Sequence, residues 1–139
     1  MLRSSARQSA VRAVDTNILV RFFAADDEKQ SPVARALIVG VDVFVPTTVV
    51  LETEWVLRSA YGFAPSAIAN SLRMLGGLPR VSLENAVATV QALDLLEQGV
   101  DFADALHLIQ SAHCEAFVTF DRKLARRAKT TGAPRIVLL

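Results

Sequence analysis

Short apolar segments alternate along the chain with longer segments in which apolar residues recur every three or four positions. The short runs predict strands at 12–14, 43–45, 80–82, 116–119 and 136–138. The periodic segments predict helices at 18–24, 31–40, from Thr47 or Thr48 to 60, 66–76, 84–98, 101–109 and 122–129. This alternation predicts an α/β fold with a parallel sheet and helices on both of its faces.

Local capping signals define the ends of several of these helices. Ser31 followed by Pro32 predicts a helix start with Ser31 as the N-cap, and Thr47 or Thr48 is predicted to cap the next helix. Gly99 ends the strongly periodic segment that precedes it.

Length and composition indicate one folded domain with its own core. The chain has 139 residues, of which 52% are hydrophobic, and a mean hydropathy of +0.34. Cys114 is the only cysteine, so an internal disulfide is excluded. No segment approaches the roughly 20 consecutive apolar residues of a membrane span. We expect a cytoplasmic protein without a membrane partner.

The first residues are basic and lack the apolar centre of a secretory signal. We assign residues 1–11 to an N-terminal extension and residues 12–139 to the domain. The extension is either disordered or encoded upstream of the true start codon.

Basic residues gather at the C-terminal end, although the formal net charge is only +1. No acid follows Asp121, whereas six cations do: Arg122, Lys123, Arg126, Arg127, Lys129 and Arg135. A nucleic-acid contact and a solvated helix face explain this pattern equally well.

Several acids fall where the predicted fold would gather them. Asp15 closes the first predicted strand, and Asp121 follows the fourth. Glu52 lies early on a helix that starts at the same edge of the sheet, and Asp101 and Asp104 begin another helix. Ligands of open parallel sheets bind at the carboxyl ends of the strands, so these acids are expected to face one cleft.

Unpaired carboxylates in one cleft repel each other. At 5 Å and an effective dielectric of about 20, each pair costs roughly 3 kcal/mol. A divalent cation offsets that repulsion, and carboxylate oxygens suit Mg²⁺ or Mn²⁺ better than zinc. Such ions activate water and stabilise the charge that develops in phosphodiester cleavage, so the pattern is compatible with this chemistry.

Each acid also has a purely structural interpretation. Asp15 and Asp121 could cap the helices that follow them, and Asp101 is better explained as an N-cap. Glu52 could face solvent beside Glu54, which lies about 200° away around the helix, so that both cannot point into one cleft.

Other polar and aromatic residues receive smaller roles. Thr16 and Asn17 could orient the Asp15 carboxylate or a metal-bound water. His107 is interpreted as a helix-face histidine rather than a ligand, and Trp55 as part of the core rather than a base-stacking residue. The sequence contains neither a glycine-rich phosphate loop nor a Ser/His/Asp pattern.

Four segments together resemble the motifs of PIN domains, in order and spacing. They are Ala13–Arg21 with Asp15, Val49–Arg58 with Glu52, Asp101–Leu108 with Asp104, and Val118–Leu124 with Thr119 and Asp121. The resemblance runs from about Arg12 to Leu139 and is strongest to VapC-like toxins of type II toxin–antitoxin modules.

This resemblance implies a three-layer fold around a five-stranded parallel sheet of order 3-2-1-4-5, in which the first and fourth strands are neighbours. It also implies an endoribonuclease that uses Mg²⁺ or Mn²⁺, forms a homodimer and is inhibited by a cognate antitoxin. The implied metal-binding catalytic acids are Asp15, Glu52, Asp104 and Asp121, and the implied supporting residues are Asn17 and Thr119.

The sequence is also compatible with other functions. A PIN-like enzyme of RNA processing and a noncatalytic module that binds RNA or a partner would share these motifs. A signalling receiver of similar topology is disfavoured because it needs a lysine after its last strand, and no lysine follows Lys129.

Overall fold

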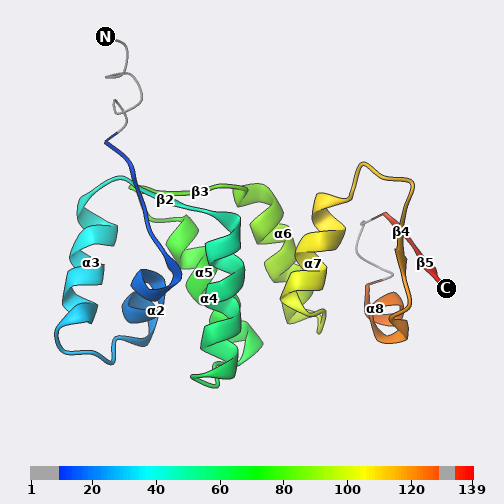
Figure 1. Ribbon diagram of the computed structural model, residues 1–139, viewed down its shortest axis with the longest axis horizontal. Coiled ribbons are helices and arrows are strands. Elements are labelled where there is room, and N and C mark those ends of the chain that lie inside the picture. The colour runs from blue at the N-terminus through cyan, green and yellow to red at the C-terminus, as the bar shows by residue number, and fades with distance from the viewer. Residues whose placement is uncertain (1–9, 129–133) are drawn as a thin grey trace, which may run out of the picture.

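The computed structural model of the chain describes residues 10–128 and 134–139. Most of the expected N-terminal extension, and Lys129 of the basic segment, lie outside these residues. The elements are β1 Arg12–Ala13, α2 Thr16–Ala24, α3 Gln30–Gly40, β2 Val43–Val45, α4 Thr47–Ser59, α5 Pro65–Gly76, β3 Val81–Leu83, α6 Ala86–Glu97, α7 Phe102–Gln110, β4 Ala116–Thr119, α8 Arg122–Arg127 and β5 Arg135–Leu138 (Figure 1). Every predicted helix and strand is present, with ends that differ by a residue or two.

Two parallel sheets replace the single predicted sheet. β1, β2 and β3 form the first, with Arg12 opposite Val43 and Val43 opposite Val81. β2 is its central strand, and Val43 and Val45, which lie on the same face of the strand, are fully buried, whereas Phe44 on the other face is partly exposed. β4 and β5 form the second sheet, with Ala116 opposite Arg135. The α/β class is confirmed.

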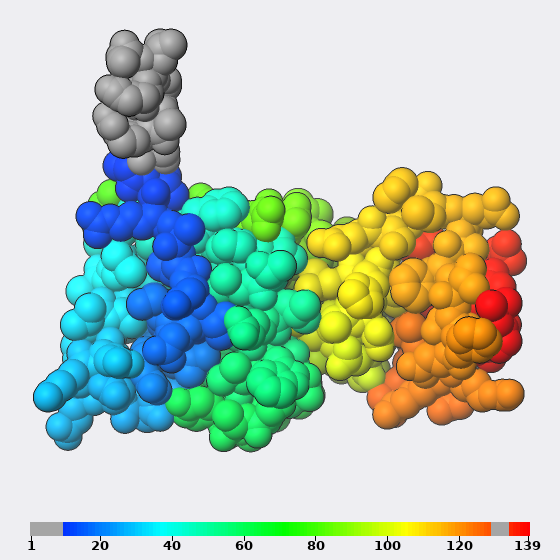
Figure 2. Space-filling model, in the orientation of Figure 1, coloured from blue at the N-terminus to red at the C-terminus, as the bar shows by residue number. Residues whose placement is uncertain are grey.

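The predicted five-stranded order is present only in its 3-2-1 half. Within residues 10–128 and 134–139, β1 pairs with β2 and β4 pairs with β5, so β1 and β4 are not neighbours. The α6 and α7 helices lie between the first sheet and the β4–β5 pair (Figure 1). Atoms of β4, α8 and β5 form one end of the molecule, beyond α7 (Figure 2).

Contacts of α8 explain this position of the C-terminal unit, by which we mean β4, α8 and β5. The Arg127 Nη1 group donates a 2.7 Å hydrogen bond to the carbonyl of Gly99, in the α6–α7 turn. Leu124 is buried in the same core cluster as Leu96 and Val100. The C-terminal unit is therefore fixed through α8 to the α6–α7 turn rather than through β4 to β1.

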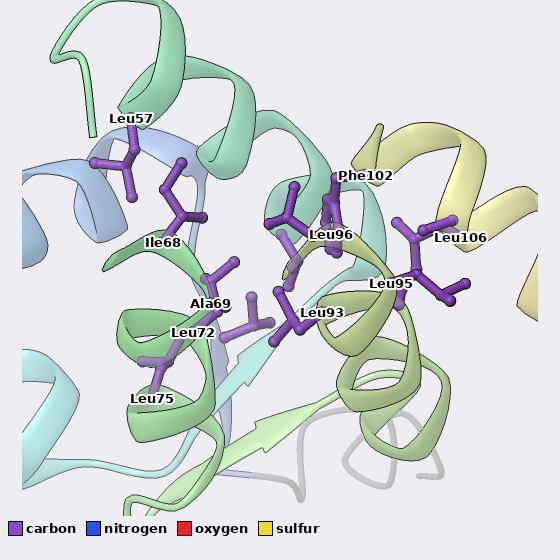
Figure 3. Close-up of a cluster of buried hydrophobic side chains, with 14 of the residues drawn as sticks. Leu57, Ile68, Ala69, Leu72, Leu75, Leu93, Leu95, Leu96, Phe102 and Leu106 are labelled. Atoms are coloured by element: carbon purple, nitrogen blue, oxygen red, sulfur yellow. The ribbon is translucent and has the colours of Figure 1, made fainter. Parts of the chain in front are cut away.

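The core lies between the helices and the first sheet. Its largest fully buried side chains come from β2 and from helices α2 to α7, and those of α4 to α7 include Leu57, Ile68, Leu72, Leu93 and Phe102 (Figure 3). Among the described residues, no helix is long and apolar enough to cross a bilayer.

Two predicted helix caps are wrong, because tertiary partners take over the groups involved. The Ser31 hydroxyl donates to the Arg21 carbonyl at 2.9 Å and so ties α3 to α2. The start of α3 is instead capped by Asp27, whose carboxylate accepts two backbone N–H bonds at 2.7 and 2.9 Å. Neither threonine hydroxyl caps α4, and the Thr47 N–H donates to Glu84 Oε1 at 2.8 Å.

Candidate active site

Acidic side chains meet cations in a groove between α4, α7 and α8, which we call the acidic groove. Its volume is about 420 Å³. The carboxylates that line it are Glu54, Asp101, Asp104 and Asp121, and the cations are Arg58, Lys123 and Arg127. The structure thus brings together two of the four predicted catalytic acids, Asp104 and Asp121.

Asp104 lies in the first turn of α7, and Asp101 caps this helix. The Asp101 carboxylate accepts a 3.2 Å hydrogen bond from the Asp104 N–H, as its structural interpretation predicts. Burial, followed by the negative charges of Asp101 and Asp121, raises the pKa of Asp104, while His107 acts in the opposite direction. Burial and the neighbouring carboxylates thus disfavour the charged form of the Asp104 side chain.

Asp121 is held by its own local structure. Its Oδ1 atom accepts hydrogen bonds from the N–H groups of Lys123 at 2.9 Å and Leu124 at 3.0 Å, so it caps α8. The Asp121 N–H donates to the Thr119 hydroxyl at 3.0 Å. Thr119 therefore fixes the backbone at Asp121, and among the residues that the structure describes none donates a hydrogen bond to the Asp121 Oδ2 atom.

Asp15 and Glu52 form a second group, on α2 and α4. Asp15 caps α2 by accepting a 3.3 Å hydrogen bond from the Ile18 N–H. The hydroxyl of Thr16, its neighbour, donates to Glu52 Oε1 at 2.5 Å and connects the two helices. Asn17 lines a separate hollow between α2 and α3.

A second groove adjoins the acidic groove and contains Glu52. Eight residues line it: Thr48, Leu51, Glu52, Glu54, Trp55, Arg58, Asp101 and Ala103. We call it the Trp55 groove. Glu54, Arg58 and Asp101 line both grooves, so a continuous surface leads from Glu52 to Asp104 and Asp121.

The donor chemistry of these acids suits a hard divalent cation, but their positions do not complete a metal centre. No three acid, histidine or cysteine side chains converge on one point within the described residues. The separation follows from the sheets: Asp15 ends β1 and Asp121 follows β4, and these strands are not paired.

Comparison with protein families matches residues 12–130 to the PIN domain. The chain belongs to the PIN domain family. PIN domains are generally nucleases that use divalent metal ions, so membership indicates a hydrolase acting on nucleic acid. None of the curated proteins compared with the chain matches it.

Glu54 is the buried partner of Arg58 in this PIN domain, and the expectation that Glu52 and Glu54 cannot share one cleft is wrong, because both line the Trp55 groove. Glu54 is 1% exposed, and its carboxylate accepts hydrogen bonds from Arg58 Nε at 2.8 Å and Nη2 at 3.4 Å. The hydrogen bond that Arg58 donates to Glu54 raises the pKa of Arg58. The spacing of four residues is the sequence signal for this pair, and Glu52 is left exposed on another face of α4.

The prediction that Trp55 belongs to the core is wrong. Its exposed fraction is 57%, because α4 turns the face formed by Val50, Thr53, Glu54 and Leu57 inward. The apolar spacing of Val50 and Leu57 was the available sequence signal, since neither shares its side of a helix with position 55.

Proposed function

We propose that this PIN domain is a metal-dependent endoribonuclease that hydrolyses RNA phosphodiesters, with Mg²⁺ or Mn²⁺ as its cofactor. The observation that carries this proposal is the acidic groove, where Asp104 and Asp121 lie beside three cations in a PIN domain. Carboxylates alone would repel RNA, and cations alone would bind it without a means of cleavage. Their combination suits a phosphodiester substrate held close to a divalent ion.

The proposed metal-binding catalytic acids are Asp15, Glu52, Asp104 and Asp121. A bound divalent ion would supply an activated water and would offset charge that develops on the phosphate. Thr119 supports this site by fixing the backbone of Asp121. Asn17 is a weaker candidate for support, because it lines the hollow between α2 and α3.

Three cations would neutralise the phosphate backbone beside these acids. Arg58 comes from α4, and Lys123 and Arg127 come from α8. Arg58 is held in place by Glu54, and Arg127 is held by the Gly99 carbonyl. Guanidinium groups that are already oriented lose less conformational freedom when they bind phosphate.

We further propose that β4 pairs with β1 in the active form and completes the sheet order 3-2-1-4-5, a rearrangement in which α8 leaves the α6–α7 turn and the acidic groove is rebuilt around Asp121. Two-stranded sheets are at best marginally stable on their own. The C-terminal unit also exposes apolar side chains, with exposed fractions of 56% for Val118, 80% for Phe120 and 41% for Leu138. Pairing with β1 would cover part of this surface and would bring Asp15 and Asp121 to the same sheet edge.

The biological role that we propose is the toxin component of a VapC-like type II toxin–antitoxin system in the cytoplasm, acting as a homodimer and inhibited by a cognate antitoxin. The four motif segments support this assignment by their resemblance to that group. A PIN nuclease of RNA processing and a noncatalytic PIN module are the alternatives. Coexpression with the product of a small adjacent gene, followed by a test for loss of cleavage, separates the toxin from both.

Cleavage of a structured RNA by the purified protein tests the enzymatic proposal. Reactions with EDTA, Mg²⁺ and Mn²⁺ are run beside Asp121→Asn, and Glu28→Gln serves as a control because Glu28 is an exposed acid outside both grooves. We expect cleavage that needs the cation, disappears in Asp121→Asn and persists in Glu28→Gln. Cleavage that survives EDTA, or that Asp121→Asn retains in full, would reject the assigned site.

A further inference from the structure

The largest aromatic side chain of the protein lies exposed beside the carboxylates. Trp55 is 57% exposed and lines the Trp55 groove together with Glu52, Arg58 and Asp101. Tryptophan is on average well buried in folded proteins, although isolated exposed apolar residues are common. Position rather than exposure makes this residue informative, because the groove continues into the acidic groove.

The Trp55 groove is charged rather than apolar, and Arg58 is its one cation beside three carboxylates that would repel phosphate in the absence of a bound cation. Four of the eight residues that line the Trp55 groove are charged, namely Glu52, Glu54, Arg58 and Asp101. Arg58 follows Trp55 by three positions on α4, which places both side chains on neighbouring parts of the helix surface. A flat aromatic ring beside an oriented guanidinium group offers a surface for a base and a partner for its phosphate.

We propose that Trp55 is a stacking platform for an unpaired RNA base close to the cleaved phosphate, with Arg58 contacting the adjoining phosphate. This proposal rests on the proposed nuclease function and adds a residue that determines its substrate preference. Unpaired bases stack on aromatic side chains, whereas bases inside a duplex are not accessible to them. The enzyme should therefore prefer single-stranded RNA at the point of cleavage.

The indole fluorescence provides a direct test, because Trp55 is the only tryptophan of the chain. The wild-type protein in EDTA is titrated with a short unstructured oligoadenylate, and separately with the same strand annealed to its complement. We expect the single strand to quench the emission to saturation and the duplex to leave it nearly unchanged. Unchanged emission with the single strand, or equal quenching by both RNAs, would overturn the proposal.

Substitutions separate stacking from a structural role. Trp55→Ala should raise the Kd for a labelled single strand by about 5- to 150-fold, and Trp55→Phe should restore most of the affinity. Val87→Ala is the control, because Val87 is 74% exposed on α6 and lies outside both grooves. In cleavage assays, Trp55→Ala should raise KM with little change in kcat.

Two further results would contradict the assignment. Wild-type affinity in Trp55→Ala would exclude stacking. A second copy of the chain would cover Trp55 if two results occurred together. Without RNA, the indole emission would change with protein concentration, and Trp55→Ala would alter the sedimentation coefficient.

The two proposals can fail separately. If the protein cleaves no RNA but the single strand still quenches Trp55, the nuclease proposal fails and the base contact stands. If cation-dependent cleavage is observed and Trp55→Ala binds and cleaves as the wild type does, the nuclease stands and the stacking role of Trp55 is rejected.

Discussion

Removal of the Arg58 guanidinium should destabilise the protein well beyond the usual effect of a surface charge. The Glu54 carboxylate is 2% exposed as a side chain, and Arg58 approaches it at 2.8 Å. In Arg58→Ala the carboxylate remains in its buried position on α4 and loses this partner. The substitution therefore measures the free energy needed to keep a buried carboxylate without its cation.

The expected magnitude follows from the burial of the two groups. Breaking a fully buried ion pair on one side costs about 3–5 kcal/mol. The Arg58 side chain is 42% exposed, so water already reaches this pair, and we expect Arg58→Ala to cost about 2–3 kcal/mol. Glu54→Gln keeps the shape of the side chain and should cost about 1 kcal/mol for the weaker hydrogen bond.

Urea unfolding of four proteins completes the test as a double-mutant cycle. The proteins are the wild type, Glu54→Gln, Arg58→Ala and the double variant. We expect the double variant to be more stable than Arg58→Ala alone, because it no longer buries an unpaired charge, with a coupling free energy of about 1–2 kcal/mol.

Arg80→Ala is the matched control for this cycle. Its partner is Asp42 at 2.9 Å, and the two side chains are 49% and 51% exposed. An exposed pair of this kind contributes roughly 0–1 kcal/mol. If Arg58→Ala costs no more than Arg80→Ala, or if the two substitutions in the cycle are simply additive, Glu54 is not a buried partner that depends on Arg58.

Three further predictions concern the acids and the strands. Asp104→Asn should raise the urea midpoint of the metal-free protein at neutral pH, because burial and neighbouring carboxylates raise the Asp104 pKa. The stability gain of Asp104→Asn should shrink as the pH falls through the raised pKa of Asp104, because the folded wild type binds a proton there more tightly than the unfolded chain. A variant that is less stable than the wild type at neutral pH would refute this prediction. Asp27→Ala should lower the midpoint at neutral pH, because two backbone N–H groups at the start of α3 hold the pKa of Asp27 below its usual value, and the loss should vanish as the pH falls through that lowered pKa. Equal midpoints at neutral pH would contradict this role. In a Cys114→Ser background, a short thiol crosslinker should join Ala13→Cys to Val118→Cys within one chain if β4 pairs with β1, and failure to do so in the active protein would reject the completed sheet.

Local sequence patterns predicted the helices and strands, because each helix or strand depends mainly on residues close to it in the sequence. The run of β-branched and aromatic residues at Val43–Val45 forms the predicted strand, and the spacing of Leu93 and Leu96 defines the inner face of α6. The cap assigned to Ser31 failed because its hydroxyl found the Arg21 carbonyl, which is ten residues away and comes close only after α2 and α3 pack. Tertiary contacts of this kind are not encoded in the capping pattern itself.

In the candidate site too, local interactions were predicted correctly and tertiary contacts were not. The capping roles of Asp15, Asp101 and Asp121 were legible because each uses the amides that follow it. The choice between Glu52 and Glu54 was not, because helical geometry separates the two side chains without indicating which one faces the core. Burial of Glu54 was decided by how α4 packs, and Arg58 made it tolerable.

Convergence of the four acids is the feature least accessible to sequence patterns, because it depends on strands far apart in the chain. Asp15 is fixed at the start of α2, and Asp121 is fixed by Thr119 and the start of α8, so each acid has its local geometry before the sheets meet. In the structure α8 holds the C-terminal unit against the α6–α7 turn, so the proposed pairing of β4 with β1 requires this unit to move. A cation that binds both acids stabilises the paired arrangement by mass action. Strand pairing and metal binding should therefore be coupled, so that Mg²⁺ or Mn²⁺ increases crosslinking between β1 and β4 in the wild-type site and does not do so when Asp121 is replaced by Asn.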